Sequence, residues 1–404
     1  MSDVLNRNIV ILFFTQLIFV SGTVMIVTVG GIVGNELASD PALATLPLSF
    51  MVIGTALTTI PATMIMQRIG RRLGFALAAV VAFSAALLAA YALETRSFVL
   101  YCLATMTVGM TLAFSQQFRF AAAESVPLQR VSYAISFILL GSIGGAFVGP
   151  ELAARSQDYS PATPFLAATL ATAALYLVAF CLILNLRIKP LNAEVGSQSA
   201  ARPLRQMAAA PLFIVAVLGG VVGQGVMTFV MTATPLSMHA VDGHNIAETA
   251  SVIRAHVIAM YLPSLISGPL IGRFGALKLM TVGALAMLLT IGIGLSGQQV
   301  MHYWGALMVL GIGWNFLFVG GTTLLVSNYR QSEKFRAQAV NEFSVFGVSA
   351  VASLLAGVVI VQWGWPTLLL SATPAIALML MAIGWAAYNR EDDVLATSTR
   401  ETGQ

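Results

Sequence analysis

A small set of polar and ionisable residues interrupts the long apolar runs of this 404-residue sequence. An ionisable group inside such a run is costly to bury and is usually kept for binding or for proton exchange. Amides and hydroxyls there can form hydrogen bonds with a polar solute. The candidates for substrate binding or ion coupling are Gln16, Gln116, Arg119, Gln224, Thr232, His256, Asn315, Asn341 and Glu342.

These candidates also have structural alternatives. His256 could exchange protons near neutral pH, or it could be a buried neutral imidazole bonded to a backbone carbonyl. Arg119 could extend to the cytoplasmic surface, and Thr232 could bond the backbone of its own helix. We expect His256 and Asn315 to face a central aqueous path. Interhelical hydrogen bonding is the alternative for Gln16, Gln224 and Asn315.

The composition places these residues in a membrane protein. Hydrophobic residues make up 58% of the chain and charged residues 9%, whereas a soluble domain has about 25% charged residues. So little charge cannot cover a water-exposed surface, which indicates a polytopic membrane protein. The net charge of +4 gives no reason to expect nucleic acid. Cys102 and Cys181 lie in apolar runs without metal-ligand spacing, so we expect no metal and no cofactor.

The apolar runs are long enough to cross a bilayer as helices, which takes about 20 residues each. The first run, Ile9 to Val33, exceeds the apolar region of a signal peptide, so we expect it to be retained as a span. Only helices satisfy the backbone of such continuous runs in lipid. The sequence therefore predicts an all-α fold with twelve spans at about 8–33, 43–66, 73–93, 97–122, 130–152, 162–186, 211–236, 246–272, 277–297, 301–327, 336–362 and 365–388.

The distribution of Lys and Arg predicts the orientation of these spans. With both termini in the cytoplasm, all but three of the 20 Lys and Arg residues fall on the inner side. The exceptions are Arg96, Arg155 and Arg254. We therefore expect an integral protein of the cytoplasmic (inner) membrane with both termini inside.

A cationic loop that contains glycine occurs twice, as "MQRIGRRLGF" (66–75) and as "LIGRFGALKL" (270–279). Gly70 and Gly275 are 205 positions apart, and two further loop arginines, 130 and 336, are 206 apart. A constant offset indicates two six-helix halves in parallel repeat. The predicted parts are an N-terminal half (1–186), a cytoplasmic linker (187–210), a C-terminal half (211–388) and a cytoplasmic tail (389–404).

With these spans, linker and loops, the whole chain resembles the major facilitator superfamily. That family carries an acid-Arg-x-Gly-Arg-Arg motif between its second and third helices. Gln67 stands where the family has a carboxylate that helps to lock the cytoplasmic gate, which is a departure. A gate and a pure topology signal are the two interpretations of the loop. The matching residues are Arg68, Gly70, Arg71 and Arg72, with Arg273 and Gly275 in the second copy.

The predicted fifth helix resembles the antiporter signature of the same family through Gly145, Gly149 and Pro150, although Ala153 replaces the closing glycine. Close packing of small residues is the alternative. Four other segments resemble a bacterial subgroup for which uptake of a vitamin-like molecule such as riboflavin is one association. Efflux and uptake therefore both stay open. These segments are 231–240, 256–268, 313–325 and 339–347.

The superfamily fold also implies a charge pair. In that fold the inner ends of the fourth and eleventh helices approach each other when the cytoplasmic side closes. Arg119 lies near the inner end of the fourth helix, and Glu342 lies roughly 9 Å into the eleventh. We hypothesise an ion pair that protonation of Glu342 weakens, which would couple a proton to the switch. The alternatives are that Arg119 pairs with Glu124 or binds an anionic substrate.

The resemblance implies a secondary transporter that moves a small molecule by alternating access. We expect it to be coupled to protons or another ion and to work as a monomer in contact with membrane lipid. No GxxxxGK[ST] loop supports ATP hydrolysis, and no HExxH or GxSxG motif supports an enzyme. The remaining alternative is a non-transporting sensor or assembly factor on a transporter fold.

Overall fold

The described part of the chain consists of helices joined by short turns. Within that part there is no β-strand, which confirms the predicted all-α class. The computed structural model describes residues 6–39, 43, 46–159, 163, 165–188, 202–244 and 246–401.

Eleven segments of the described residues are long and apolar enough to cross a membrane. The last of them, Gln331–Tyr388, has 58 residues, or about 87 Å of helix, whereas the hydrocarbon core is about 30 Å thick. It is divided at Gly364, where φ is 74° and ψ is 178°. The division falls between the predicted spans 336–362 and 365–388, so the count is consistent with twelve.

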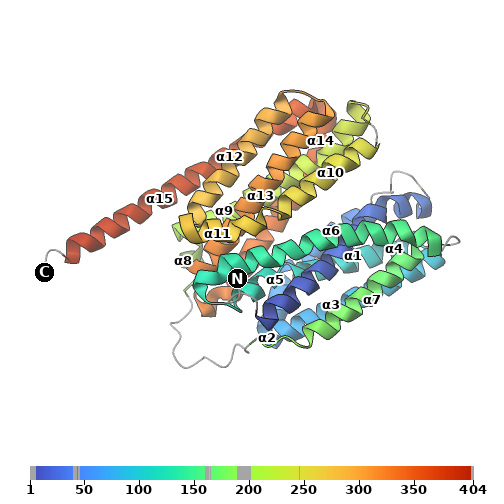
Figure 1. The fold of residues 1–404 in the computed structure, drawn as a ribbon, viewed down its shortest axis with the longest axis horizontal. Helices are drawn as coiled ribbons and strands as arrows, with labels where there is room; N and C mark the ends of the chain where they lie inside the picture. The colour runs from blue at the N-terminus through green and yellow to red at the C-terminus, as the bar shows by residue number, and fades with distance from the viewer. Residues whose placement is uncertain are drawn as a thin grey trace. The chain divides into compact units, whose positions relative to one another are not determined.

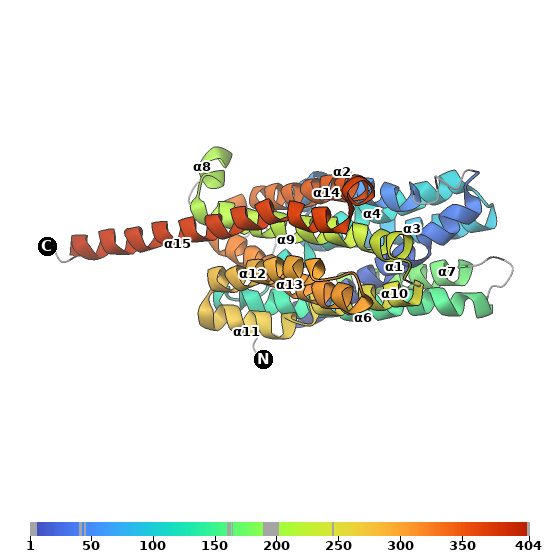
Figure 2. The same ribbon diagram turned by 90° about the horizontal axis from the view of Figure 1, so that it is seen from above.

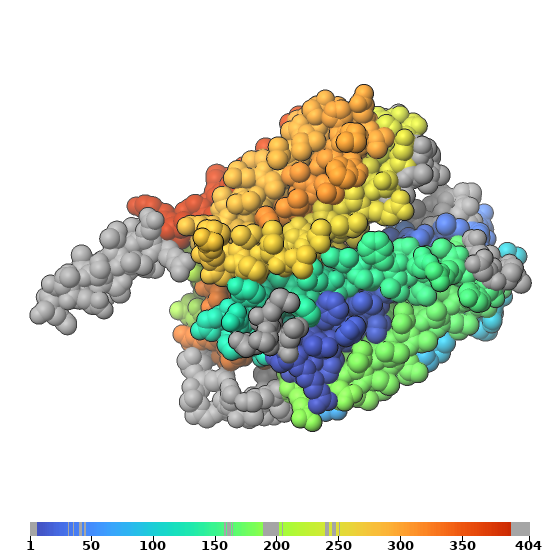
Figure 3. Space-filling model, in the orientation of Figure 1, coloured from blue at the N-terminus to red at the C-terminus, as the bar shows by residue number. Residues whose placement is uncertain are grey.

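Unit 1 of the structure comprises Met1–Gln198 and Gln338–Phe343 (Figure 1). In it α1 packs against α6 and α7, α2 against α4, and α3 against α4 and α7. Figure 3 shows α1 between α6 and α7 on one face. The elements are α1 (Arg7–Leu37), α2 (Leu46–Ile69), α3 (Arg71–Glu94), α4 (Phe98–Ser115), α5 (Phe118–Ala123), η2 (Leu128–Arg130), α6 (Val131–Tyr159) and α7 (Leu166–Ile183).

Unit 2 comprises Ser199–Ala337 and Ser344–Gln404. Its helix α13 packs against α9, α10 and α12, and α15 packs against α9 and α12 (Figure 2). Residues 189–201 of the predicted linker lie outside the described residues. The elements are α8 (Leu204–Ala208), α9 (Pro211–Pro235), η4 (Leu236–Val241), α10 (Ile246–Tyr261), α11 (Ser264–Phe274), α12 (Ala276–Leu295), α13 (Val300–Asn328), η5 (Gln331–Glu333), α14 (Lys334–Ser371) and α15 (Thr373–Glu401).

Two predicted spans are interrupted rather than continuous. Span 97–122 is divided into α4 and α5, because the backbone N–H of Gln117 bonds the carbonyl of Phe114 (3.0 Å) in a tighter turn than an α-helix makes. Span 246–272 is divided into α10 and α11 next to Pro263, since proline lacks the N–H that a continuous helix needs. Both breaks adjoin polar candidates and change the direction in which the following side chains point.

The two repeated loops place glycine in the same backbone conformation. Gly70 precedes α3 with φ 85° and ψ 163°, and Gly275 precedes α12 with φ 86° and ψ 159°. A positive φ favours glycine over residues with a side chain. An added Cβ would meet nothing within 4 Å at either position, so the conformation, not space, requires glycine. The shared conformation supports the parallel repeat.

Helix α6 approaches the backbone of α1 through its glycines. A Cβ at Gly145 would lie 2.7 Å from the carbonyl oxygen of Leu17, and a Cβ at Gly149 would lie 2.6 Å from that of Ser21. Such contacts are closer than real Cβ atoms tolerate, so these positions need glycine for close helix packing.

We expect Gly149→Val to lower the free energy of unfolding by at least about 1–3 kcal/mol, since the added atoms meet backbone that no rotamer change can relieve. Gly357→Val in α14 is the matched control, because a Cβ there meets nothing within 4 Å. Thermal unfolding of both variants measures the difference. Equal melting temperatures would contradict the close approach of α6 to α1.

Candidate functional site

A buried polar cluster surrounds Arg71, the first residue of α3. Its Nη2 donates to Glu124 Oε1 at 2.7 Å and to Gln338 Oε1 at 2.6 Å. Its Nη1 donates to Gln117 Oε1 at 2.9 Å. All four residues belong to unit 1 and are called the Arg71 cluster below. The planar guanidinium can bond several oxygen acceptors at once, which a lysine ammonium cannot do in this geometry.

Burial distinguishes Arg71 from the rest of the loop motif. Its exposed fraction is 2%, whereas Gln67, Arg68 and Arg72 are exposed. The carboxylate that pairs with Arg71 comes from Glu124, which follows α5, and not from position 67. The departure from the family motif at Gln67 therefore does not leave the buried arginine without an acidic partner.

Three members of the Arg71 cluster are not among the candidates expected from the sequence. Gln117 and Glu124 flank α5, and Gln338 lies four residues before Glu342 in α14. Residues four apart share a helix face, so the spacing of Gln338 and Glu342 is a signal that could have indicated Gln338. No comparable sequence signal connects Glu124 with Arg71.

Arg119 and Glu342 form an ion pair, as hypothesised from the sequence. Both side chains are buried, with exposed fractions of 3% and 1%. Asn341 Nδ2 donates to Glu342 Oε1 at 2.8 Å, so this candidate contacts the same carboxylate. The alternative partner of Arg119, Glu124, bonds Arg71. Within the described residues Glu342 Oε2 accepts no hydrogen bond, and a carboxyl oxygen of this kind can take up a proton.

His256 and Asn315 lie in the packed interior of unit 2, where both are 0% exposed. The expectation that they face an aqueous path is therefore not met in this structure. The Nδ1 atom of His256 lies 2.7 Å from the Leu307 carbonyl oxygen. Asn315 accepts from Ser267 Oγ at 2.6 Å and donates to Ser264 Oγ at 2.7 Å. Their polar groups tie α13 to α10 and α11, which explains the burial of these side chains.

Two further candidates form side-chain contacts within their own unit, and a third lies at the end of α4. Gln16 Nε2 donates to Ser142 Oγ at 2.9 Å and so links α1 to α6. Thr232 Oγ1 lies 3.4 Å from Ser353 Oγ and is exposed. Gln116 is half-buried directly after α4. Any contact of these residues with a substrate stays a prediction.

Gln224 is bonded to an aromatic group on α13. Trp314 Nε1 donates to Gln224 Oε1 at 2.7 Å. The indole of Trp314 stacks on Phe318 with ring centroids 4.7 Å apart, and Tyr261 meets it edge-on at 5.6 Å. Gln224 is half-buried, whereas Trp314 is 3% exposed. The structure thus brings this candidate together with an aromatic cluster from α10 and α13.

The remaining residues of the family motifs lie in packed helix α6 or on the surface of unit 2. Gly145 and Gly149 pack on α1 as described above, and Pro150 lies inside α6, which continues to residue 159 rather than ending at 152. Arg273 is exposed, and its guanidinium lies over the Phe274 ring, 5.2 Å from the ring centroid. Close packing on α1 therefore explains why both positions are glycine, and a transport role for them stays a prediction.

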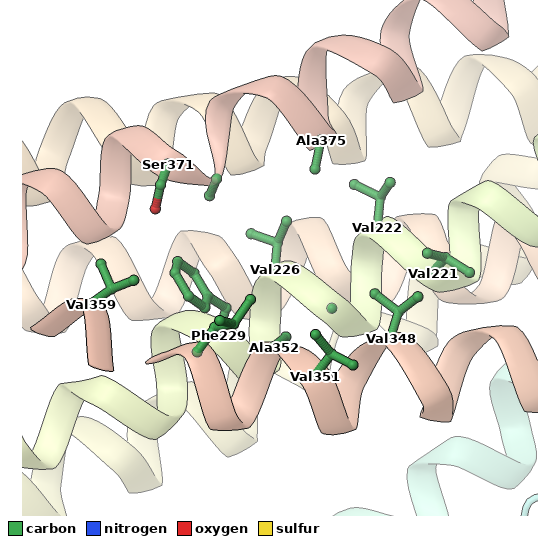
Figure 4. Close-up of a pocket in the computed structure, with 13 residues that line it drawn as sticks. Val221, Val222, Val226, Phe229, Val348, Val351, Ala352, Val359, Ser371 and Ala375 are labelled. Carbon is green, nitrogen blue, oxygen red and sulfur yellow. The ribbon is translucent and has the colours of Figure 1, made fainter. Parts of the chain in front are cut away.

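An apolar cavity of about 330 Å³ lies in unit 2 between α9, α14 and α15 (Figure 4). Val226 and Phe229 of α9 line it together with Val351 of α14. Ser371 also lines the cavity, and its hydroxyl donates to the Leu368 carbonyl at 2.8 Å. The cavity offers a polar solute almost no hydrogen-bond partner, so it is a poor site for the polar part of a substrate.

Comparisons with known proteins agree with this arrangement. Residues 12–253 match the Major Facilitator Superfamily. The riboflavin transporter RfnT of Brucella anthropi is 38% identical over 379 residues, which cover 94% of this chain and 95% of the relative. The uncharacterised MFS-type transporter YdeG of Bacillus subtilis is 26% identical over 399 residues, covering 94% of this chain and 92% of the relative.

Solved structures share the fold at low sequence identity. The transporter FucP in its outward conformation has a TM-score of 0.75 at 15% identity, with 94% of this chain and 99% of FucP covered. The human organic anion transporter MFSD10 has a TM-score of 0.74 at 11% identity, with 93% and 99% covered. At these identities the likeness concerns the fold alone.

Proposed function

Because this chain belongs to the Major Facilitator Superfamily and is a secondary transporter of small molecules, we propose that it carries riboflavin, or a closely related flavin, into the cell. The observation that carries this proposal is the 38% identity to a riboflavin transporter over 94% of the chain. The family resemblance seen in the loops is confirmed by the same comparisons. A non-transporting sensor is not favoured, and no catalytic role is proposed.

We propose that uptake is coupled to protons through Glu342. The support is the buried ion pair with Arg119, together with a second carboxylate oxygen that accepts no hydrogen bond within the described residues. A proton on Glu342 removes the negative charge and weakens the pair. The Arg119–Glu342 pair would then form and break once in each transport cycle, so that proton uptake drives the conformational change.

We also propose an orientation of the protein in the membrane. The excess of Lys and Arg in one set of loops supports an inner-membrane protein with both termini in the cytoplasm. The Arg71 cluster would then lie at the cytoplasmic end of the helices, next to the loop that contains Gly70. A monomer suffices for this arrangement, because Arg71, Glu124, Arg119 and Glu342 all come from one chain.

Uptake into proteoliposomes tests the function. With one proton per flavin and an inward pH gradient of one unit, accumulation should reach roughly tenfold, since a tenfold concentration ratio corresponds to about 1.4 kcal/mol. A protonophore should abolish the accumulation but not the exchange of labelled for unlabelled flavin. Flavin binding without flux would support a sensor, and proton-driven loss of preloaded flavin would indicate efflux. Neither binding nor flux of flavin would overturn the proposed substrate.

A further inference from the structure

The contact between Trp314 and Gln224 determines which end of the glutamine amide is available. An indole N–H can only donate a hydrogen bond. The group that faces Trp314 Nε1 at 2.7 Å must therefore be the carbonyl oxygen of Gln224. The amide NH₂ points away from Trp314, and its contact with Thr228 Oγ1 is long, at 3.5 Å. The side chain consequently presents a hydrogen-bond donor.

The indole itself is held in place by its neighbours. Phe318 stacks on it at 4.7 Å, and Tyr261 packs against it edge-on at 5.6 Å. With 3% exposure, Trp314 has no open face on which a ligand could stack. Its role is therefore to orient Gln224, and the group that can meet a ligand is the glutamine NH₂.

The position of Gln224 along α9 indicates what it faces. It is the fourteenth residue of the 28-residue span Pro211–Met238, and Trp314 is the fifteenth of 29 in Val300–Asn328. A half-buried amide at mid-span is costly against lipid and is usually found on an aqueous or substrate-filled path. Thr228 and Thr232 continue the same face at intervals of four residues; Thr228 is half-buried and Thr232 is exposed.

We propose that Gln224 donates a hydrogen bond from its NH₂ group to a ring carbonyl oxygen of the flavin, and that Trp314 is the positioning residue that imposes this donor role. The assignment rests on the proposed function, because it takes the flavin as the ligand. A flat ring that carries carbonyl oxygens offers the acceptor that an oriented amide donor requires. The aromatic cluster makes the donor direction rigid, which favours a planar acceptor over a flexible one.

Flavin binding by the purified full chain, followed through quenching of flavin fluorescence, tests the assignment. Gln224→Glu replaces the donor by an acceptor of the same shape and should weaken binding at least tenfold. Trp314→Phe keeps an aromatic ring but removes the N–H, and should weaken binding about two- to fivefold. In a Gln224→Leu background the same Trp314→Phe change should have no further effect, because it acts through Gln224. The matched control is Trp304→Phe on the same helix, at a tryptophan that is 39% exposed.

A reversed ligand preference in the Gln224→Glu variant would show that this side chain recognises the ligand directly. A general structural defect would instead weaken the binding of every ligand. A flavin analogue with an amino group in place of one ring carbonyl should bind Gln224→Glu more tightly than it binds the wild-type protein. Flavin affinity of Gln224→Glu equal to wild type, or no change in analogue preference, would overturn this assignment and leave the proposed function standing. No flavin binding by the wild-type protein would overturn both.

Discussion

Proton-driven uptake should fall by at least about 100-fold in the Glu342→Gln variant. The amide keeps the shape of the side chain but cannot gain or lose a proton, and it breaks the buried ion pair with Arg119. Breaking one partner of a buried ion pair costs about 3–5 kcal/mol, and each 1.4 kcal/mol corresponds to about tenfold. Uptake into proteoliposomes under a pH gradient measures the effect. Exchange of labelled for unlabelled substrate should fall less, because it needs no net proton movement.

Two further variants make this test specific to the ion pair. Arg119→Gln combined with Glu342→Gln should add little to either single change, because both remove the same interaction. Glu151→Gln breaks the exposed Arg155–Glu151 pair, whose side chains are 71% and 58% exposed, and should leave uptake within about twofold of wild type, since exposed pairs contribute little. Fully additive effects of the Arg119 and Glu342 changes would contradict a shared switch.

Arg71→Gln is expected to reduce both the transport rate and the melting temperature strongly. Arg72→Gln should change the transport rate by no more than about twofold and leave the melting temperature close to that of the wild type. Arg71 is buried and bonds three oxygen acceptors, so its loss breaks the buried ion pair with Glu124, at a cost of about 3–5 kcal/mol. Arg72 is exposed in the same loop. Arg71→Lys should restore only part of the activity, because an ammonium cannot bond these acceptors in the fork geometry.

The comparison of Arg71 with Arg72 decides between the two interpretations of the loop. Transport rate and melting temperature should separate the variants, while the amount of each protein in the membrane serves as the control for insertion. If both substitutions act alike, through lower insertion, the loop is a topology signal. If Arg71→Gln alone stops transport in normally inserted protein, the Arg71 cluster is part of the gate.

Some features of the structure could be predicted from the sequence, and one helix division was missed. The Gly70 and Gly275 loops were recognised because an offset of about 205 residues is visible in the chain, and their matching φ and ψ values agree with a repeat. The Arg119–Glu342 pair was expected because two opposite charges at similar depth in lipid have few other partners. In contrast, the division between α10 and α11 was missed, although Pro263 is a local signal for it.

What the sequence determined by itself is the set of spans, their repeat and the class of protein, because the bilayer requires apolar runs of a given length and a satisfied backbone. Only the tertiary structure decided that Arg71 is the buried arginine of its loop, that Glu124 and Gln338 bond it, and that His256 and Asn315 lie inside unit 2. The physical reason is rotation about the helix axis. Hydropathy sets how deep a residue lies along its helix, whereas the packing of neighbouring helices sets the direction in which its side chain points.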